Sequence, residues 1–189
     1  MMFKRRSLFA ALALTFIGTG LAAAAPDLQN TIYLDTKDGR VTIQLRPDLA
    51  PKHVQQIRTL AKRGFYDGIV FHRVIEGFMA QTGDPTGTGT GKSDLPDLPA
   101  EFSAESFKRG TLGMARSQNP NSANSQFFIC FAPAPFLDKQ YTIVGEVTAG
   151  MDVVDKIKKG SKADNGSVTN PDKIVKMQLA TDAAPAKAR

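Results

Sequence analysis

The chain has 189 residues, of which 42% are hydrophobic and 22% are charged, and its formal net charge is +6. These values are ordinary for a soluble protein with one globular domain and a hydrophobic core of its own. The single cysteine excludes an internal disulfide, and with only 2 histidines the composition argues against a zinc site. Cys130 lies in the apolar run FFICF, so we expect it to be a small buried side chain.

The first 24 residues have the layout of a secretory signal peptide. Basic residues at 4–6 precede an uncharged, mostly apolar run over 8–21, and small residues follow. The apolar run is short for a membrane-spanning helix, which needs roughly 20 apolar residues. We predict cleavage after Ala24, with cleavage after Ala25 or an uncleaved membrane anchor as the alternatives.

The charge of the remaining chain is modest. The predicted signal peptide carries three basic residues and no acidic one, so its removal lowers the formal charge from +6 to +3. The other basic residues are scattered, apart from short runs such as 156–159. This distribution does not require nucleic acid as a partner, and we expect neither nucleic acid nor membrane binding by the cleaved protein.

The rest of the chain reads as short strands with two helices. Strands are predicted at 31–35, 41–45, 69–75, 78–83, 110–115, 126–132, 141–147 and 173–180. One helix begins near Pro51 and ends near Gly64, and another runs over 150–160 with Gly160 at its end. This pattern favours a barrel or sandwich over a nucleotide-binding α/β sheet. We predict one domain over 25–180 and a disordered tail at 181–189.

The glycine-rich stretch 82–93, TGDPTGTGTGKS, ends like a phosphate-binding loop. However, Thr86 stands where such a loop requires its first glycine, and Pro96 and Pro99 prevent the helix that should follow. Without a helix N-terminus there is no row of free N–H groups for phosphates. We therefore expect a tight loop that lies close to another backbone segment, and no nucleotide site.

Two segments, FHRVIEGFMAQTGD (71–84) and NSQFFIC (124–130), resemble the cyclophilin-type peptidyl-prolyl cis/trans isomerases. Segments 136–147 and 150–157 fit the same family, so the likeness covers roughly 31–180. It implies a mainly β fold, a closed eight-stranded antiparallel β-barrel capped by two α-helices, without a cofactor or metal. With the signal peptide, it implies a monomer of the bacterial periplasmic branch that acts on proline-containing segments of unfolded or exported proteins.

The resemblance assigns site residues position by position. Arg73 matches the catalytic arginine, Gln81 the glutamine that supports it, and Phe78 an apolar residue of the pocket that accepts the substrate proline. The further substrate-binding positions that it implies are Met79, Ala115, Arg116, Gln126, Phe128, Phe136, Leu137 and Tyr141. The glycine-rich stretch matches a loop that borders the peptide groove.

Three of these positions depart from the family pattern. Arg116 stands where cytosolic members often have asparagine, and Tyr141 replaces a histidine at the groove edge. Phe136 stands where many members have the tryptophan that helps to bind cyclosporin, so only weak cyclosporin binding is expected. None of the three removes the arginine or the floor of the pocket.

An arginine suits this reaction, which breaks no covalent bond. Twisting an X–Pro amide removes its conjugation and leaves a lone pair on the proline nitrogen, which a fixed donor can stabilise. Arg73 is always charged and presents several donors in a rigid fork.

Because side chains alternate along a strand, we expect His72 to face away from Arg73 in a structural role, and Phe127 to face the core behind Phe128. The alternative to an isomerase is a chaperone-like peptide-binding protein that has the cyclophilin shape but little turnover.

Overall fold

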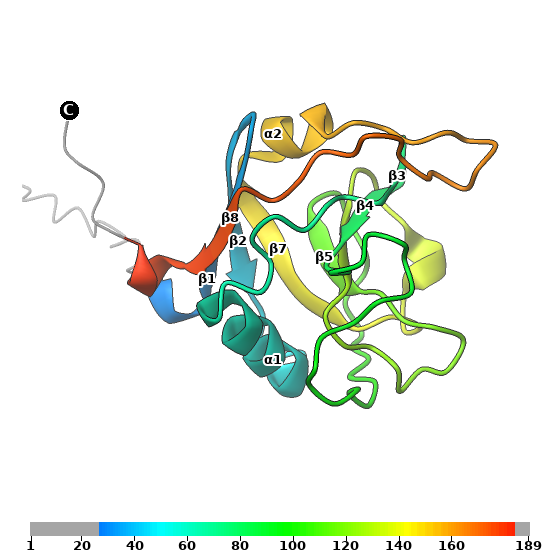
Figure 1. Cartoon of the computed structure of the whole chain (residues 1–189). Coiled ribbons are helices and arrows are strands. Elements are labelled where there is room, and N and C mark those ends of the chain that lie inside the picture. The colour runs from blue at the N-terminus through cyan, green and yellow to red at the C-terminus, as the bar shows by residue number, and fades with distance from the viewer. Residues whose placement is uncertain (1–26, 184–189) are drawn as a thin grey trace, which may run out of the picture.

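Figure 1 shows the computed structural model of the chain, which describes residues 27–183. The predicted signal peptide and positions 184–189 of the predicted tail lie outside the described residues. The helices and strands are, in chain order, η1 Leu28–Asn30, β1 Thr31–Thr36, β2 Gly39–Leu45, α1 Pro51–Lys62, β3 Arg73–Ile75, β4 Met79–Thr82, β5 Thr111–Met114, β6 Phe127–Cys130, η2 Pro135–Leu137, β7 Ile143–Ala149, α2 Met151–Lys156, β8 Lys176–Leu179 and η3 Ala180–Asp182. Helix η3 includes residues 181 and 182, the first two positions of the predicted tail.

The strands form one 8-stranded antiparallel sheet in the order β3-β4-β6-β5-β7-β2-β1-β8. The mainly β prediction is confirmed. The eight antiparallel strands are also confirmed, but their closure into a barrel is not, because β3 and β8 are the edge strands of this order. Near these edges, isolated bridges pair Val70 with Lys173 and Arg73 of β3 with Ser167.

The region where the two edge strands β3 and β8 approach each other, which we call the seam, is irregular because of the backbone between α2 and β8. Asn165, Gly166 and Asn170 have positive φ angles of 51°, 81° and 51°, which bend the chain out of an extended ladder. Scattered backbone bonds replace a regular ladder, as when Gly68 N–H donates to Ile174 O at 2.8 Å. The strands predicted at 69–75 and 173–180 are therefore shorter than expected.

The two helices lie at opposite ends of the sheet, with α1 packed against β8 and α2 against β2 (Figure 1). Helix α1 begins at Pro51 as predicted. Helix α2 ends at Lys156, several residues before the predicted end, because Ile157 already has extended backbone angles. Gly160 instead donates its N–H to Val74 O at 2.9 Å, so its predicted role as the end of the helix is wrong.

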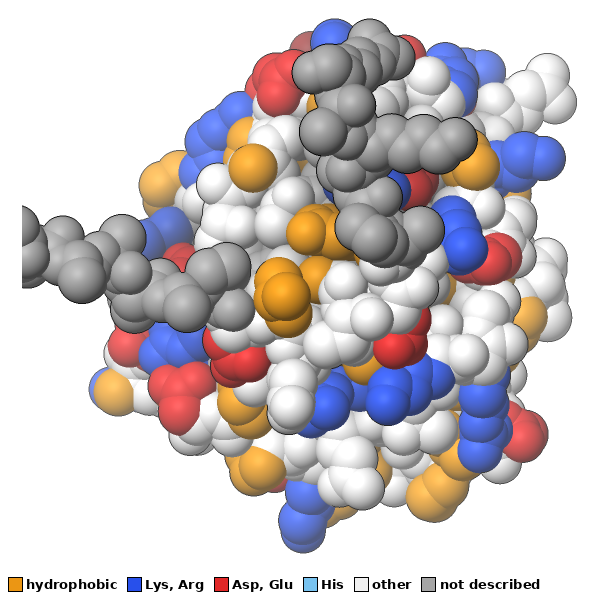
Figure 2. Space-filling model, turned by 90° about the vertical axis from the view of Figure 1, so that its left-hand side faces the viewer, with side chains coloured by type: hydrophobic (Ala, Val, Ile, Leu, Met, Phe, Trp, Pro, Cys, Tyr) orange, Lys and Arg blue, Asp and Glu red, His pale blue; other side chains and the backbone are white. Residues whose placement is uncertain are grey.

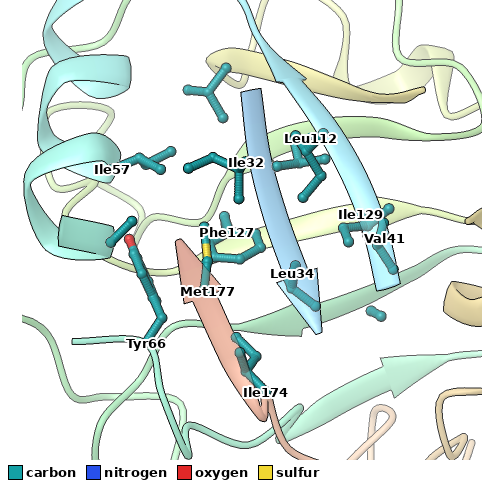
Figure 3. Packing of buried hydrophobic residues seen from close by; sticks show 14 of the residues in the cluster. Ile32, Leu34, Val41, Ile57, Tyr66, Leu112, Phe127, Ile129, Ile174 and Met177 are labelled. Carbon is teal, nitrogen blue, oxygen red and sulfur yellow. The ribbon is translucent and has the colours of Figure 1, made fainter. Parts of the chain in front are cut away.

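Alternation along the strands sorts side chains between two apolar clusters. The larger one fills the interior, where labelled side chains from β1, β2, β6, β8 and α1 point toward one another (Figure 3). Phe127 and Ile129 belong to this interior cluster, as the alternation predicts. Phe128 and Cys130 belong to a second cluster on the other face of the sheet. Cys130 is fully buried, and burial raises its pKa to about 12, so it is an inert thiol.

The first and last elements of the described chain, η1 and η3, are in contact at one side of the molecule (Figure 1). Figure 2 shows that side, where acidic and basic side chains are interspersed rather than gathered by sign. Within residues 27–183, no helix has the length and apolar character needed to cross a membrane.

Candidate active site

A cleft of about 370 Å³ opens on the outer face of the sheet, over β4 and β6; we call it the apolar cleft. Met79, Phe128 and Leu137 form its floor as members of the second apolar cluster. All the residues assigned from the sequence line this cleft except Gln126. Gln140, which the sequence did not suggest, also lines it. Phe78, Met79, Phe128 and Leu137, the four apolar residues that the resemblance matches to the proline pocket, are therefore packed together and still reach a surface cleft.

The floor depends on a glycine in the strand beneath it. Gly113 of β5 pairs with Phe128 of β6, and a Cβ atom on Gly113 would lie 2.4 Å from Phe128 Cζ and 2.6 Å from Phe107 Cε1. The missing side chain lets the Phe128 ring lie flat over the strand, stacked on Phe107 with ring centroids 5.8 Å apart. Tyr141 meets Phe128 edge-on from the rim, at 6.0 Å between centroids.

Arg73 lies at the edge of the apolar cleft, and its hydrogen-bond partners within residues 27–183 are neutral. Its Nη1 donates to Gln81 Oε1 at 3.2 Å, across the pair of strands in which the two residues are directly opposite. Its Nε and Nη2 donate to Asn165 O at 3.0 Å and Asn165 Oδ1 at 2.9 Å. Among residues 27–183, no carboxylate lies within ion-pair distance of it. Burial lowers its pKa, but an arginine stays charged at physiological pH.

Asn165 is the residue of this site that the sequence analysis missed. It lies 92 positions from Arg73, on a segment held against β3 by a bond from Val74 N–H to Gly166 O at 2.8 Å. A side chain on Gly160 would lie 1.9 Å from Gly166 O, so two glycines allow this close approach. The Asn-Gly pair was a visible turn signal, but nothing local in the sequence indicated that it faces Arg73.

Replacing Asn165 with glycine is expected to lower kcat/KM for a prolyl peptide about three- to tenfold, with the unfolding temperature close to that of the wild type. Glycine keeps the positive φ but removes the Oδ1 that fixes Nη2 of Arg73. Asn170→Gly is the matched control, because Asn170 has the same φ of 51° and does not bond to Arg73. Equal kinetics for the two variants would remove Asn165 from a positioning role.

Gln81 connects Arg73 to the glycine-rich loop. Gln81 Nε2 donates to Gln126 Oε1 at 2.9 Å, and Gln126 Nε2 donates to Gly89 O at 3.0 Å and to Gly91 O at 2.8 Å. Gln126 thus does not line the apolar cleft itself but bonds to Gln81, which does. It lines an adjoining cleft of about 430 Å³, which we call the polar cleft.

The N–H groups of the glycine-rich loop bind a carboxylate of the protein itself. Asp84 accepts from Thr86 N–H at 2.7 Å, Gly89 N–H at 2.5 Å and Gly91 N–H at 3.1 Å. A Cβ on Gly91 would lie 2.1 Å from Asp84 Oδ1. The glycines therefore serve an internal anion, and the expected close backbone approach occurs at Gly83, where a Cβ would lie 2.4 Å from Ser125 O.

Asp84→Asn is expected to lower the free energy of unfolding by about 2 kcal/mol at pH 7. Burial disfavours the charge of Asp84, but hydrogen bonds from Thr86, Gly91 and Gly89 lower its pKa to about 2. Because this folded-state pKa is below the value of about 3.9 in an unfolded chain, the stabilisation is present at neutral pH and is lost as the pH falls from about 4 to 2.

Urea unfolding at pH 7 and at pH 2.5 measures this effect. The difference between wild type and Asp84→Asn should be large at pH 7 and small at pH 2.5. Asp94→Asn, at an exposed position with a side chain 79% accessible, is the control and should change little at either pH. A pH-independent difference for Asp84→Asn would contradict the role of its charge.

His72 lies under the glycine-rich loop and outside the apolar cleft. A Cβ on Gly89 would lie 3.6 Å from both Cδ2 and Nε2 of His72. Its ring is buried, burial lowers its pKa, and neither ring nitrogen has a hydrogen-bond partner within the described part of the chain. A neutral imidazole in this position fills space beneath the loop. This agrees with the expectation that His72, next to Arg73 in the chain, faces away from it.

The chemistry available here is binding and electrostatic stabilisation. The apolar cleft offers a socket for a small ring, and beside it stands a cation held by Gln81 and Asn165. Residues 27–183 contain no group of three or more His, Cys, Asp or Glu side chains placed to hold a metal ion. Such a site can grip an apolar group and donate a hydrogen bond to an atom next to it.

Comparison with known proteins agrees with this geometry. Residues 31–179 match the family described as cyclophilin type peptidyl-prolyl cis-trans isomerase/CLD. The chain is 58% identical over 194 aligned residues to a probable peptidyl-prolyl cis-trans isomerase of Brucella suis, covering 96% of this chain and 99% of that protein.

Two solved structures are similar. The cyclophilin AquaCyp293 of Hirschia baltica has a TM-score of 0.75 and 29% identity, covering 84% of this chain and 77% of its own. A cyclophilin type peptidyl-prolyl cis-trans isomerase of Cryptosporidium parvum, crystallised in the presence of the dipeptide Ala-Pro, has a TM-score of 0.72 and 28% identity, covering 79% and 98%. The chain therefore belongs to the cyclophilin-type peptidyl-prolyl cis-trans isomerases and is an isomerase enzyme.

Proposed function

We propose that the protein speeds rotation about X–Pro bonds by holding the proline ring in the apolar cleft while Arg73 stabilises the twisted amide. The observation that carries this proposal is the Arg73 guanidinium at the edge of an apolar cleft, bonded to the neutral groups of Gln81 and Asn165 and without an ion-pair partner among residues 27–183. A barrier of roughly 18–20 kcal/mol holds the planar amide, and a catalyst must favour the twisted form over both planar forms.

The surroundings of Arg73 support these two roles, binding of the proline ring by the cleft and stabilisation of the twisted amide by the arginine. Met79, Phe128 and Leu137 can bury the proline ring, and burial of a side chain of that size contributes roughly 1.5–3 kcal/mol. The amides of Gln81 and Asn165 orient the guanidinium without neutralising it. An arginine donor aimed at the proline nitrogen is then strongest in the twisted state, where that nitrogen has a free lone pair.

We also propose that the substrates are proline-containing segments of exported proteins that fold in the periplasm. The support is the sequence of the first 24 residues, with basic residues, a short apolar run and small residues before Pro26. Cell fractionation and the mass of the purified protein test this proposal directly. Full-length protein retained in the cytoplasm or in the membrane fraction would overturn it.

The isomerase proposal is tested by measuring cis/trans exchange of a short Ala-Pro peptide by NMR with catalytic amounts of the protein. Uncatalysed exchange takes on the order of 10–100 s, so acceleration is easily observed. Acceleration that saturates with peptide concentration supports the proposal. Peptide binding without faster exchange would instead identify a peptide-holding protein.

A further inference from the structure

We infer that Arg116 selects peptides that carry a carboxylate within about three residues of the proline, a distance of roughly 10 Å along an extended chain. This inference rests on the proposed function and names a preference within its substrate class. Arg116 lines both the apolar and the polar cleft, and it follows β5 directly after Ala115. A peptide that leaves the apolar cleft toward the polar cleft must therefore pass beside it.

Arg116 is held in place by neutral groups. Its Nη1 donates to Ser117 O at 2.8 Å and its Nη2 to Gln140 O at 3.0 Å, with longer bonds from Nη1 to Gln118 O and from Nε to Gln140 O. Its Cζ lies 4.4 Å from the centroid of the Tyr141 ring. These contacts fix the guanidinium before a ligand arrives, so little side-chain entropy is lost on binding. At least one of its five N–H donors stays available.

The two clefts carry more positive than negative charge. Their cations are Arg73, Arg116 and Lys92. Asp97 is the one carboxylate among the described residues that line them, and Lys92 Nζ lies 2.9 Å from its Oδ2. Arg73 and Arg116 are therefore left without a compensating anion in the described part of the chain. Because Arg73 faces the apolar cleft, Arg116 is the cation that can meet a side chain flanking the proline.

The inference predicts a measurable substrate preference. Peptides with Glu or Gln placed two residues before, or two residues after, the proline are compared at low ionic strength. With the wild type, kcat/KM should be about three- to tenfold higher for Glu than for Gln in at least one of the two positions. Arg116→Gln should reduce this ratio to near one, whatever its effect on the rate with the Gln peptides.

The matched control is Arg58→Gln, which removes the same charge from α1 outside both clefts and should keep the Glu preference. A preference that survives in Arg116→Gln, or that is lost equally in Arg58→Gln, overturns the inference. If Arg116→Gln does not fold, salt dependence of the wild type tests the inference instead. The Glu/Gln ratio of kcat/KM must then fall toward one as the salt concentration is raised. A ratio insensitive to salt overturns the inference.

The isomerase proposal and this inference fail in different ways. NMR titration gives the Kd of each peptide whether or not exchange is accelerated. A lack of acceleration with tighter binding of the Glu peptides contradicts the isomerase mechanism and supports the charge preference. Acceleration with equal Kd and equal kcat/KM for the Glu and Gln peptides supports the mechanism and overturns the preference.

Discussion

Replacing Arg73 with glutamine is expected to lower kcat/KM for a short Ala-Pro peptide by about 10²- to 10³-fold. Glutamine can still bond to its neighbours, but it cannot offer a fixed cationic donor to the proline nitrogen. The loss should fall mainly on kcat, because the proposed mechanism places the proline ring on Met79, Phe128 and Leu137, which do not change. NMR exchange at several peptide concentrations separates kcat from KM.

Arg73→Lys distinguishes charge from geometry. Lysine keeps the charge but loses the planar fork that reaches Gln81 and Asn165 at once, so we expect activity between those of the wild type and Arg73→Gln. Arg58→Gln is the control for loss of one positive charge elsewhere and should retain wild-type kinetics. Unchanged kcat in Arg73→Gln would contradict the proposed mechanism.

Gly113→Ala is expected to raise KM for the same peptide about tenfold and to lower the free energy of unfolding by about 1–3 kcal/mol. The new methyl group would lie 2.4 Å from Phe128 Cζ, so the ring must move from its place at the floor of the apolar cleft. The stack of Phe128 on Phe107 would be lost with it. Peptide kinetics and urea unfolding measure the two effects.

Gly145→Ala in β7 is the matched control for Gly113→Ala. A Cβ there would lie 2.7 Å from Gln44 O, so the variant is also overpacked, but Gly145 lies outside the apolar cleft. It should lose stability and keep the wild-type KM. If Gly113→Ala folds and also keeps the wild-type KM, Phe128 does not form the floor on which the substrate proline rests.

The resemblance assigned Arg73, Gln81 and Phe128 to one site, and local rules account for the face of the sheet that each side chain occupies. Side chains two apart on a strand share a face, and paired strands bring opposite residues together. Gln81 therefore lies opposite Arg73 in the β3–β4 pair, and Phe128 lies opposite Gln81 in the β4–β6 pair. The same alternation places Phe127 in the interior cluster.

The helix start at Pro51 and the failed phosphate loop were also readable from the chain, because both depend on what proline and glycine allow within a few residues. The destination of the loop N–H groups was not readable in this way. The loop folds around Asp84 and is held by Gln126, which is 35 residues from Gly91. Which acceptor these donors find depends on the folded path of the loop.

Only the tertiary structure decided that Asn165 bonds to Arg73, how the sheet is arranged at the seam between β3 and β8, and which groups surround Arg116. Asn165 reaches Arg73 because positive φ angles and two glycines bring a distant turn onto β3. The same bends shorten the edge pairing and leave the strand order open between β3 and β8. Sequence patterns record which face of a strand a side chain occupies. They do not record which remote backbone lies against that face, since this follows from the packing of the whole chain.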